Sequence, residues 1–142
     1  MPEHWDVTER IIGCCFNVIN ELGPGFLESV YEKSLLVALH DAHLKAESQV
    51  PVGVVFRGQC VGEFFADIMV EGTVIVELKA VKALTTEHKS QLINYLTATK
   101  TPVGLLVNFG GTVLEYRRLT PRERPKENPH ADRQEGVEHL EG

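Results

Sequence analysis

Cysteine is scarce in this chain, and the few cysteines present form no recognisable pattern. Only three occur in 142 residues, two of them are adjacent (Cys14 and Cys15), and no Cys-x-x-Cys pair is present. Three cysteines cannot all pair with one another, and sequence neighbours are poorly placed to form a bridge. Neither a disulfide framework nor a cysteine-based zinc site is therefore indicated. We expect a protein of the reducing cytoplasm.

Long hydrophobic runs and an excess of basic residues are also missing. No apolar run approaches the roughly 20 residues of a membrane-spanning helix, and the first residues lack the basic and apolar regions of a signal peptide. We therefore expect no membrane partner. The chain has 14 Lys and Arg against 20 Asp and Glu, a net charge of −6. Because proteins that bind phosphates by bulk electrostatics usually have a basic surface, a nucleic-acid role would need a local site, a metal ion or a partner protein.

The composition is that of one globular domain followed by a tail. Hydrophobic residues make up 43% and charged residues 24%, which are ordinary values for a folded protein of this size. From Pro121 to Pro129, prolines alternate with charged residues, and few apolar residues follow. We predict a domain over residues 1–119 and a charged, proline-containing, disordered tail over residues 120–142. A segment that folds on contact with a partner is the alternative.

Hydrophobic periodicity predicts eight elements, separated by glycine- and proline-containing turns. They are helices ending at Leu22 and spanning about 26–43 and 85–99, and strands over 50–56, 60–70, 73–80, 103–107 and 112–118, with a turn at 57–59. The order α-α-β-β-β-α-β-β predicts an α/β protein with an α+β-like order. In such a protein a mixed β-sheet is flanked by helices.

The sharpest chemical feature is Asp67 followed by Glu77-Leu78-Lys79. Alternate residues of a strand share a face, so Glu77 and Lys79 project together while Leu78 points into the core. A carboxylate at the end of an apolar stretch is unfavourable unless it is paired or bound to metal. Two carboxylates and a lysine suit metal-assisted phosphodiester hydrolysis, because carboxylates hold Mg²⁺ and the ammonium can orient water. The alternative is a surface Glu-x-Lys ion pair beside an unrelated Asp.

The hairpin that links these acids must have a particular register. Asp67 and Glu77 can share a metal only if they lie on the same face of neighbouring strands. This requires an antiparallel hairpin centred on Gly72 with an odd number of loop residues, most simply the loop 71–73 with a glycine-dependent bulge. A two-residue loop would turn Glu77 to the other face.

Two helices add further candidates. Gly25, Glu28 and Tyr31 are spaced at i, i+3 and i+6, and we expect Glu28 to be semi-buried and to need a partner. Its alternative role is a favourable position at a helix N-terminus. On the third helix, Gln91 and Tyr95 share a stripe that could hold a phosphate or fix the lysine. The alternative for this stripe is an ordinary half-exposed boundary.

Five segments together resemble a known family. Residues 25–31, 66–70, 76–80, 91–96 and 104–110 are similar, in the same order, to the motifs of the GxxExxY proteins. This family is placed in the PD-(D/E)xK nuclease-like superfamily, whose restriction-endonuclease-like core has the order α-β-β-β-α-β. The resemblance covers about residues 7–118. It implies the same core here, with one extra helix before it and one extra strand after it.

The resemblance also implies roles for individual residues. Asp67 and Glu77 would be metal ligands for Mg²⁺ or Mn²⁺, joined by Glu28, with Lys79 as the motif lysine and the Leu78 carbonyl as a further oxygen ligand. Gln91 and Tyr95 match a Gln-x-x-x-Tyr pattern that would bind the substrate, while Gly25, Glu28 and Tyr31 form the family motif. Ala66 stands where the superfamily name has proline.

The implied function is a metal-dependent nuclease acting on DNA, with RNA as the second choice. The alternative is a catalytically silent nuclease-like interaction or structural module. The sequence leaves open a homo-oligomer or a protein partner.

The composition of the tail gives a first testable prediction. Deleting residues 121–142 should change the melting temperature by no more than about 2–4 °C, the shift that ~1 kcal/mol produces in a domain of this size. Thermal unfolding of the full-length and shortened chains measures the difference. A larger drop would show that the tail docks on the domain.

Overall fold

The computed structural model describes residues 4–122, which form helices and strands in the predicted order. The elements are α1 (Trp5–Leu22), α2 (Glu28–Asp41), β1 (Ala46–Phe56), β2 (Gln59–Val70), β3 (Val74–Lys79), α3 (Thr86–Thr99), β4 (Val103–Asn108) and β5 (Glu115–Leu119). From residue 123 onward, the predicted tail lies outside the described residues. None of the helices within residues 4–122 combines the length and the apolar composition that are needed to cross a membrane.

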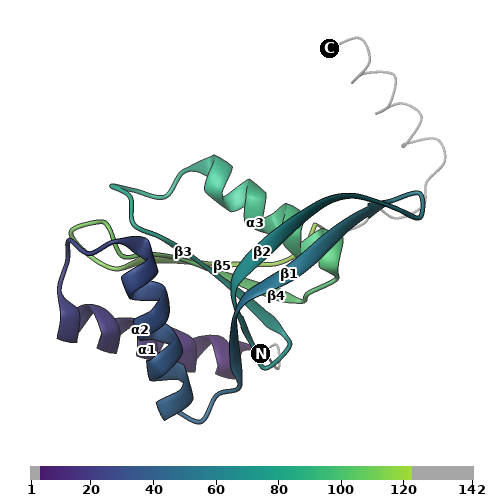
Figure 1. Ribbon diagram of the computed structural model, residues 1–142. Coiled ribbons are helices and arrows are strands. Elements are labelled where there is room, and N and C mark those ends of the chain that lie inside the picture. The colour runs from purple at the N-terminus through teal and green to yellow at the C-terminus, as the bar shows by residue number, and fades with distance from the viewer. Residues whose placement is uncertain (1–3, 123–142) are drawn as a thin grey trace.

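The fold class predicted from the sequence is confirmed. The strands form one five-stranded sheet of order β1-β2-β3-β4-β5, in which β3 and β4 are parallel and the other neighbours antiparallel. Helices α1 and α2 cover one face and α3 covers the other (Figure 1). Successive side chains of β3 point alternately to the two helical layers. Val74, Val76 and Leu78 join the core beneath α1 and α2, whereas Ile75 packs with Leu92 of α3.

The hairpin between β2 and β3 has the predicted register. Val70 pairs with Val74 and Ile68 with Val76, so the connection contains three residues. Gly72 has φ 66°, in the left-handed region that a tight connection of this kind uses. The ladder ends at Ile68 and Val76, so Asp67 and Glu77 are the next residues beyond the last pair.

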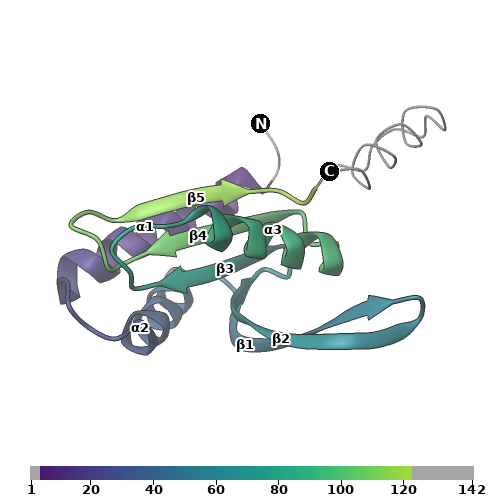
Figure 2. The same ribbon diagram turned by 90° about the horizontal axis from the view of Figure 1, so that it is seen from above.

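From Gln59 to Ala66, the part of β2 before Asp67, the strand pairs only with β1 and has no partner in β3. The resulting two-stranded arm, residues 48–66, extends past the rest of the sheet (Figure 2). Its tip is a two-residue turn, because Phe56 pairs with Gln59, so the predicted turn at 57–59 is one residue too long. The arm exposes Cys60 and several apolar side chains, namely Val55, Phe56, Val61 and Phe65.

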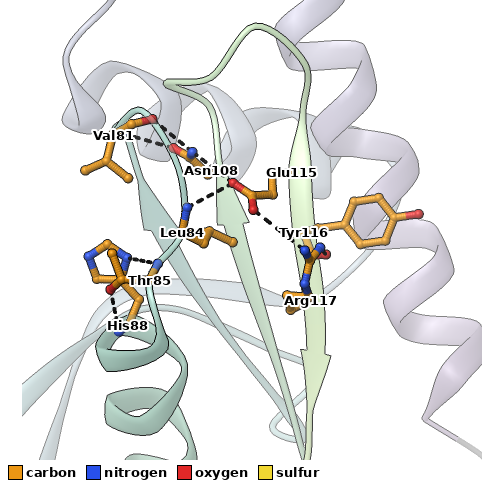
Figure 3. Close-up of polar contacts among 8 residues, drawn as sticks. All are labelled: Val81, Leu84, Thr85, His88, Asn108, Glu115, Tyr116 and Arg117. Carbon is orange, nitrogen blue, oxygen red and sulfur yellow. Dashed lines mark hydrogen bonds and ion pairs between the residues drawn. The ribbon is translucent and has the colours of Figure 1, made fainter.

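The loop that leaves β3 is fastened by Asn108 at the end of β4 (Figure 3). Asn108 pairs with Lys79 in the β3–β4 ladder and is fully buried. Its Oδ1 accepts the Val81 N–H (3.0 Å) and the Gly110 N–H (2.9 Å), and its Nδ2 donates to the Val81 carbonyl (2.9 Å). A side chain at Gly110 is excluded, since its Cβ would lie 2.3 Å from the Val81 nitrogen. Both backbone polar groups of Val81, two residues after Lys79, are therefore held by Asn108.

The far end of the same loop is fastened by Glu115 of β5. Its Oε1 accepts the Leu84 N–H (3.0 Å), and this hydrogen bond is the largest cause of the lowered pKa of Glu115. Thr85 follows and caps α3, because its hydroxyl accepts the His88 N–H while His88 Nδ1 accepts the Thr85 N–H. The start of α3 is thus fixed relative to the end of β3.

The buried amide of Asn108 generates a second prediction. Asn108→Ala leaves the N–H and carbonyl of Val81 without partners, so the free energy of unfolding should fall by about 2–4 kcal/mol. Asn17→Ala, on an exposed position of α1, should change it by less than about 0.5 kcal/mol. Urea unfolding of the two variants tests this, and equal midpoints would contradict the role of Asn108.

Candidate active site

Asp67 and Glu77 lie at the point where β2 and β3 separate, and each carboxylate accepts a hydrogen bond from the other strand. We call this pair of contacts the crossing. The Asp67 N–H donates to Glu77 Oε1 (3.2 Å), and the Leu78 N–H donates to Asp67 Oδ2 (2.8 Å). The backbone ladder between these strands ends at Ile68 and Val76, so the two carboxylates take the place of the next ladder partners. Each half-buried side chain is oriented by the opposite strand.

The positive groups near Asp67 and Glu77 do not offset the repulsion between the two carboxylates. Burial raises the pKa of Glu77 to about 8, and the charge of Asp67 beside it acts in the same direction. The Asp67 N–H and the Lys79 ammonium oppose this shift of the pKa without cancelling it. The site holds two acidic groups whose joint ionisation is unfavourable until a cation is present.

Glu28 is the first residue of α2 and is exposed, so the expectation that it would be semi-buried was wrong. It directly follows Leu27, which is 76% exposed, at the uncovered start of the helix. Partial desolvation and the charge of Asp67 raise the pKa of Glu28, while Lys79 and His88 lower it. Glu28 therefore lies within electrostatic reach of the crossing.

The start of α2 is set by Tyr31, the last residue of the predicted motif. Its hydroxyl donates to the Gly23 carbonyl (2.7 Å) and accepts the Phe26 N–H (3.2 Å). Its ring stacks on Phe109, with centroids 4.8 Å apart and planes 9° apart. Between these bonds, Gly25 has φ 98°, which favours glycine. Gly25 and Tyr31 thus shape the turn from which Glu28 projects and do not themselves join the acids.

On the opposite face, α3 brings Tyr95 to the acids. Desolvation and the charge of Glu77 raise the pKa of Tyr95, and a side-chain hydrogen bond with Gln91 lowers it. The Tyr95 ring stacks on Phe64 at the root of the arm, with centroids 3.6 Å apart. Gln91 is exposed and hydrogen-bonded to Tyr95.

Sequence reasoning missed two residues, Glu32 on α2 and Gln49 on β1. Glu32 is half-buried, and the charge of Asp67 and a side-chain hydrogen bond with Asp67 help to raise its pKa, for which desolvation is the largest cause. Gln49 Nε2 donates to both Glu32 carboxylate oxygens, at 3.0 and 3.1 Å. The spacing of Glu32 four residues after Glu28 places both on one helical face and is the signal that could have identified it.

The donor set fits a divalent cation through two carboxylates. Within residues 4–122, no three His, Cys, Asp or Glu side chains are grouped so that they could hold a metal ion together. Glu28 is therefore near the pair without completing a ready-made set of three. Mg²⁺ commonly binds proteins through one or two carboxylates and keeps several waters. The hard oxygens and the uncompensated repulsion of Asp67 and Glu77 suit such an ion.

Comparisons with known proteins identify the superfamily and support the fold. The sequence profile of the PD-(D/E)XK nuclease superfamily matches residues 5–119. Among solved structures, that of SSO0001 is similar in fold, with a TM-score of 0.51 and 18% sequence identity over 68% of this chain. The match spans half of the SSO0001 chain, 50%. No curated protein matches the sequence. The match to the profile over nearly the whole described part shows that the chain belongs to the PD-(D/E)XK nuclease superfamily.

Proposed function

We propose that the protein is a metal-dependent nuclease that hydrolyses phosphodiester bonds of DNA, with RNA as the second substrate class. The crossing of Asp67 and Glu77 carries this proposal, because the two carboxylates lie beside each other and the charge of Lys79 acts on Glu77. Membership of a nuclease superfamily supports a nucleic-acid substrate. The motifs between Gly25 and Gly110 favour the GxxExxY branch of that superfamily.

Asp67 and Glu77 would hold Mg²⁺ or Mn²⁺, with the Leu78 carbonyl and Glu28 as further oxygen ligands. When bound, the ion supplies positive charge to the phosphate and lowers the pKa of a bound water. Lys79 would orient the attacking water, since its charge already acts on Glu77 and Glu28. The acidic residues would therefore hold the metal ion, and Lys79 would place the attacking water.

Gln91 and Tyr95 would hold the substrate backbone through hydrogen bonds to phosphate oxygens. Tyr95 is suited to this role because its ring is braced by Phe64 while its hydroxyl lies near the acids. Cys14, Cys15 and Cys60 are free thiols, which supports action in a reducing compartment such as the cytoplasm.

The raised pKa of Glu77 predicts how the stability of the metal-free protein depends on pH. The folded state holds this proton more tightly than the unfolded chain, whose glutamate has the ordinary pKa of 4.5. The stabilisation by protonated Glu77 is complete below pH 4.5 and is lost as the pH rises to about 8. Glu77→Gln cannot ionise and should lack this loss. Melting temperatures in EDTA across that window, for both proteins, test the sign. Parallel curves would contradict the raised pKa.

The experiment that tests the function separates metal binding from cleavage. In excess Mn²⁺, at about 100 times its dissociation constant, the wild type should gain about 2.7 kcal/mol of stability. Asp67→Asn and Glu77→Gln should lose this gain, since each removes a ligand charge. Lys79→Ala should keep the gain but cleave single- and double-stranded DNA and RNA at least about 10²-fold more slowly. Glu47→Gln and Lys45→Ala, both exposed, are the matched controls.

The outcomes distinguish the nuclease from a silent module. Metal-dependent stabilisation with cleavage supports the proposal, and cleavage of RNA alone would replace the proposed substrate. If the wild type gains no stability from Mn²⁺ and the acid variants melt lower in EDTA, the nuclease proposal fails. The crossing would then be a structural contact of an interaction module.

A further inference from the structure

The arm, residues 48–66, differs in charge from the rest of the chain. Its charged side chains are Arg57 and Glu63, so their charges balance, whereas the chain as a whole has a net charge of −6. The arm extends past the rest of the sheet, and its second strand leads directly into Asp67 (Figure 2). A polyanion bound at the proposed metal site can therefore follow the arm without meeting an excess of negative charge.

The root of the arm is fixed against α3. The ring of Phe64 stacks on that of Tyr95, with centroids 3.6 Å apart and planes 12° apart. Ala66 belongs to the same buried cluster as Leu92 and Leu96 of α3. These contacts give the arm a defined direction relative to the acids at its root.

The tip of the arm presents an aromatic ring and a cation together. Phe56 is 60% exposed, and the guanidinium carbon of Arg57 lies over its ring, 5.0 Å from the centroid. An exposed ring can stack on a nucleic-acid base, and a guanidinium can pair with the phosphate of the same nucleotide. The tip therefore has the two groups that hold a nucleotide.

The backbone at the tip carries a second sign of function. Arg57 has φ 51° and Gly58 has φ 78°, and two positive φ angles are typical of a type I′ turn, which favours Asn-Gly or Asp-Gly. An arginine in the left-handed region is strained, and strained residues concentrate at functional sites. The guanidinium thus has a role that closing the turn does not require.

The chemistry of the arm suits unpaired bases better than a duplex. A duplex is held mainly through its phosphates, by several Lys and Arg side chains, and Arg57 is the only one of these between residues 48 and 66. Unpaired bases, in contrast, expose their rings for stacking on aromatic side chains. The arm offers exposed Phe56 and Phe65 for such contacts.

We propose that the tip of the arm binds an unpaired nucleotide of a single strand that is held at the acids, with Phe56 stacking on the base and Arg57 pairing with the phosphate. The inference rests on the proposed function, because it takes nucleic acid as the ligand. From Ala66 to Gln59, β2 spans about 23 Å at ~3.3 Å per residue. This distance corresponds to about seven nucleotides at ~3.4 Å each.

Fluorescence anisotropy of the full-length chain with labelled oligothymidylate tests this inference, in EDTA so that metal-dependent cleavage does not occur. Phe56→Leu keeps an apolar side chain but removes the ring, so the affinity for a strand of about 15 nucleotides should fall at least about fivefold. Phe56→Tyr keeps the ring and should stay within about twofold of the wild type. Phe16→Leu removes an exposed ring from α1 and should leave the affinity unchanged.

Arg57→Asn separates binding from folding at the tip. Because Asn-Gly is favoured in a type I′ turn, this variant should melt no lower than the wild type. Its affinity for the single strand should fall, and the slope of log affinity against log salt should become shallower by about 0.7, the value for one lost phosphate contact. Lys45→Ala removes an exposed cation outside the arm and is the control. A merely structural Arg57 would lower the melting temperature and leave both binding measurements unchanged.

Cleavage in Mn²⁺ adds a test of reach. Phe56→Leu should raise KM for a strand of about 15 nucleotides and leave kcat unchanged, because the tip is remote from the acids. A strand of about four nucleotides cannot span from the acids to the tip. The wild type and Phe56→Leu should therefore cleave the short strand at equal rates.

The outcomes separate this inference from the proposed function. If Phe56→Leu binds the single strand as well as the wild type does, or if the wild type binds a duplex equally tightly or binds no single strand, the role of the arm is wrong and the nuclease proposal stands on its cleavage test. If Phe56→Leu changes the oligomeric state of the free protein in light scattering, the tip is a contact between copies and the inference is again wrong. Ring-dependent binding without cleavage in Mn²⁺ would overturn the nuclease proposal alone.

Discussion

The exchange of hydrogen bonds between Asp67 and Glu77 is the constraint on which the rest of the structure depends. Each carboxylate accepts an N–H from the strand that carries the other acid, at the last point where β2 and β3 run together. The exchange orients both side chains without neutralising them. It also marks the place where β2 leaves the sheet, so the arm and the candidate site begin at the same residue.

The end of β4 determines how the two flanking helices meet these acids. The Phe109 N–H donates to the Lys79 carbonyl (2.8 Å), and the Phe109 ring stacks on Tyr31 at the start of α2. Its neighbour Asn108 holds Val81 in the loop leading to α3. Three consecutive residues, Asn108-Phe109-Gly110, thus fasten both helices to the end of the strand that carries Glu77 and Lys79. A segment with no chemical group at the site controls its geometry.

Local pattern was enough to predict the elements and their order, because periodicity depends on neighbouring residues only. The register at Gly72 was predicted from the requirement that Asp67 and Glu77 could share a metal. Local pattern failed where tertiary geometry decides. Ala66 packs with the α3 core and Ile68 with the core under α1 and α2, although residues two apart on a regular strand share a face. Asp67 lies at this change of face, which no alternation in the sequence reveals. The contact of Glu32 with Gln49 joins a helix to a strand and is invisible for the same reason.

The acidic character of the chain and that of the site lead to one conclusion about substrate binding. A phosphodiester approaching a protein of net charge −6 meets two carboxylates at the crossing, and on that face of β3 the opposing charge is Lys79. Coulomb attraction is therefore weak until a divalent cation is held there. Under the proposed function, metal and nucleic acid bind with positive coupling, and each strengthens the affinity for the other by the same factor. On this proposal the sheet would supply fixed negative charge, so that the ion, rather than a basic surface, would attract the phosphate.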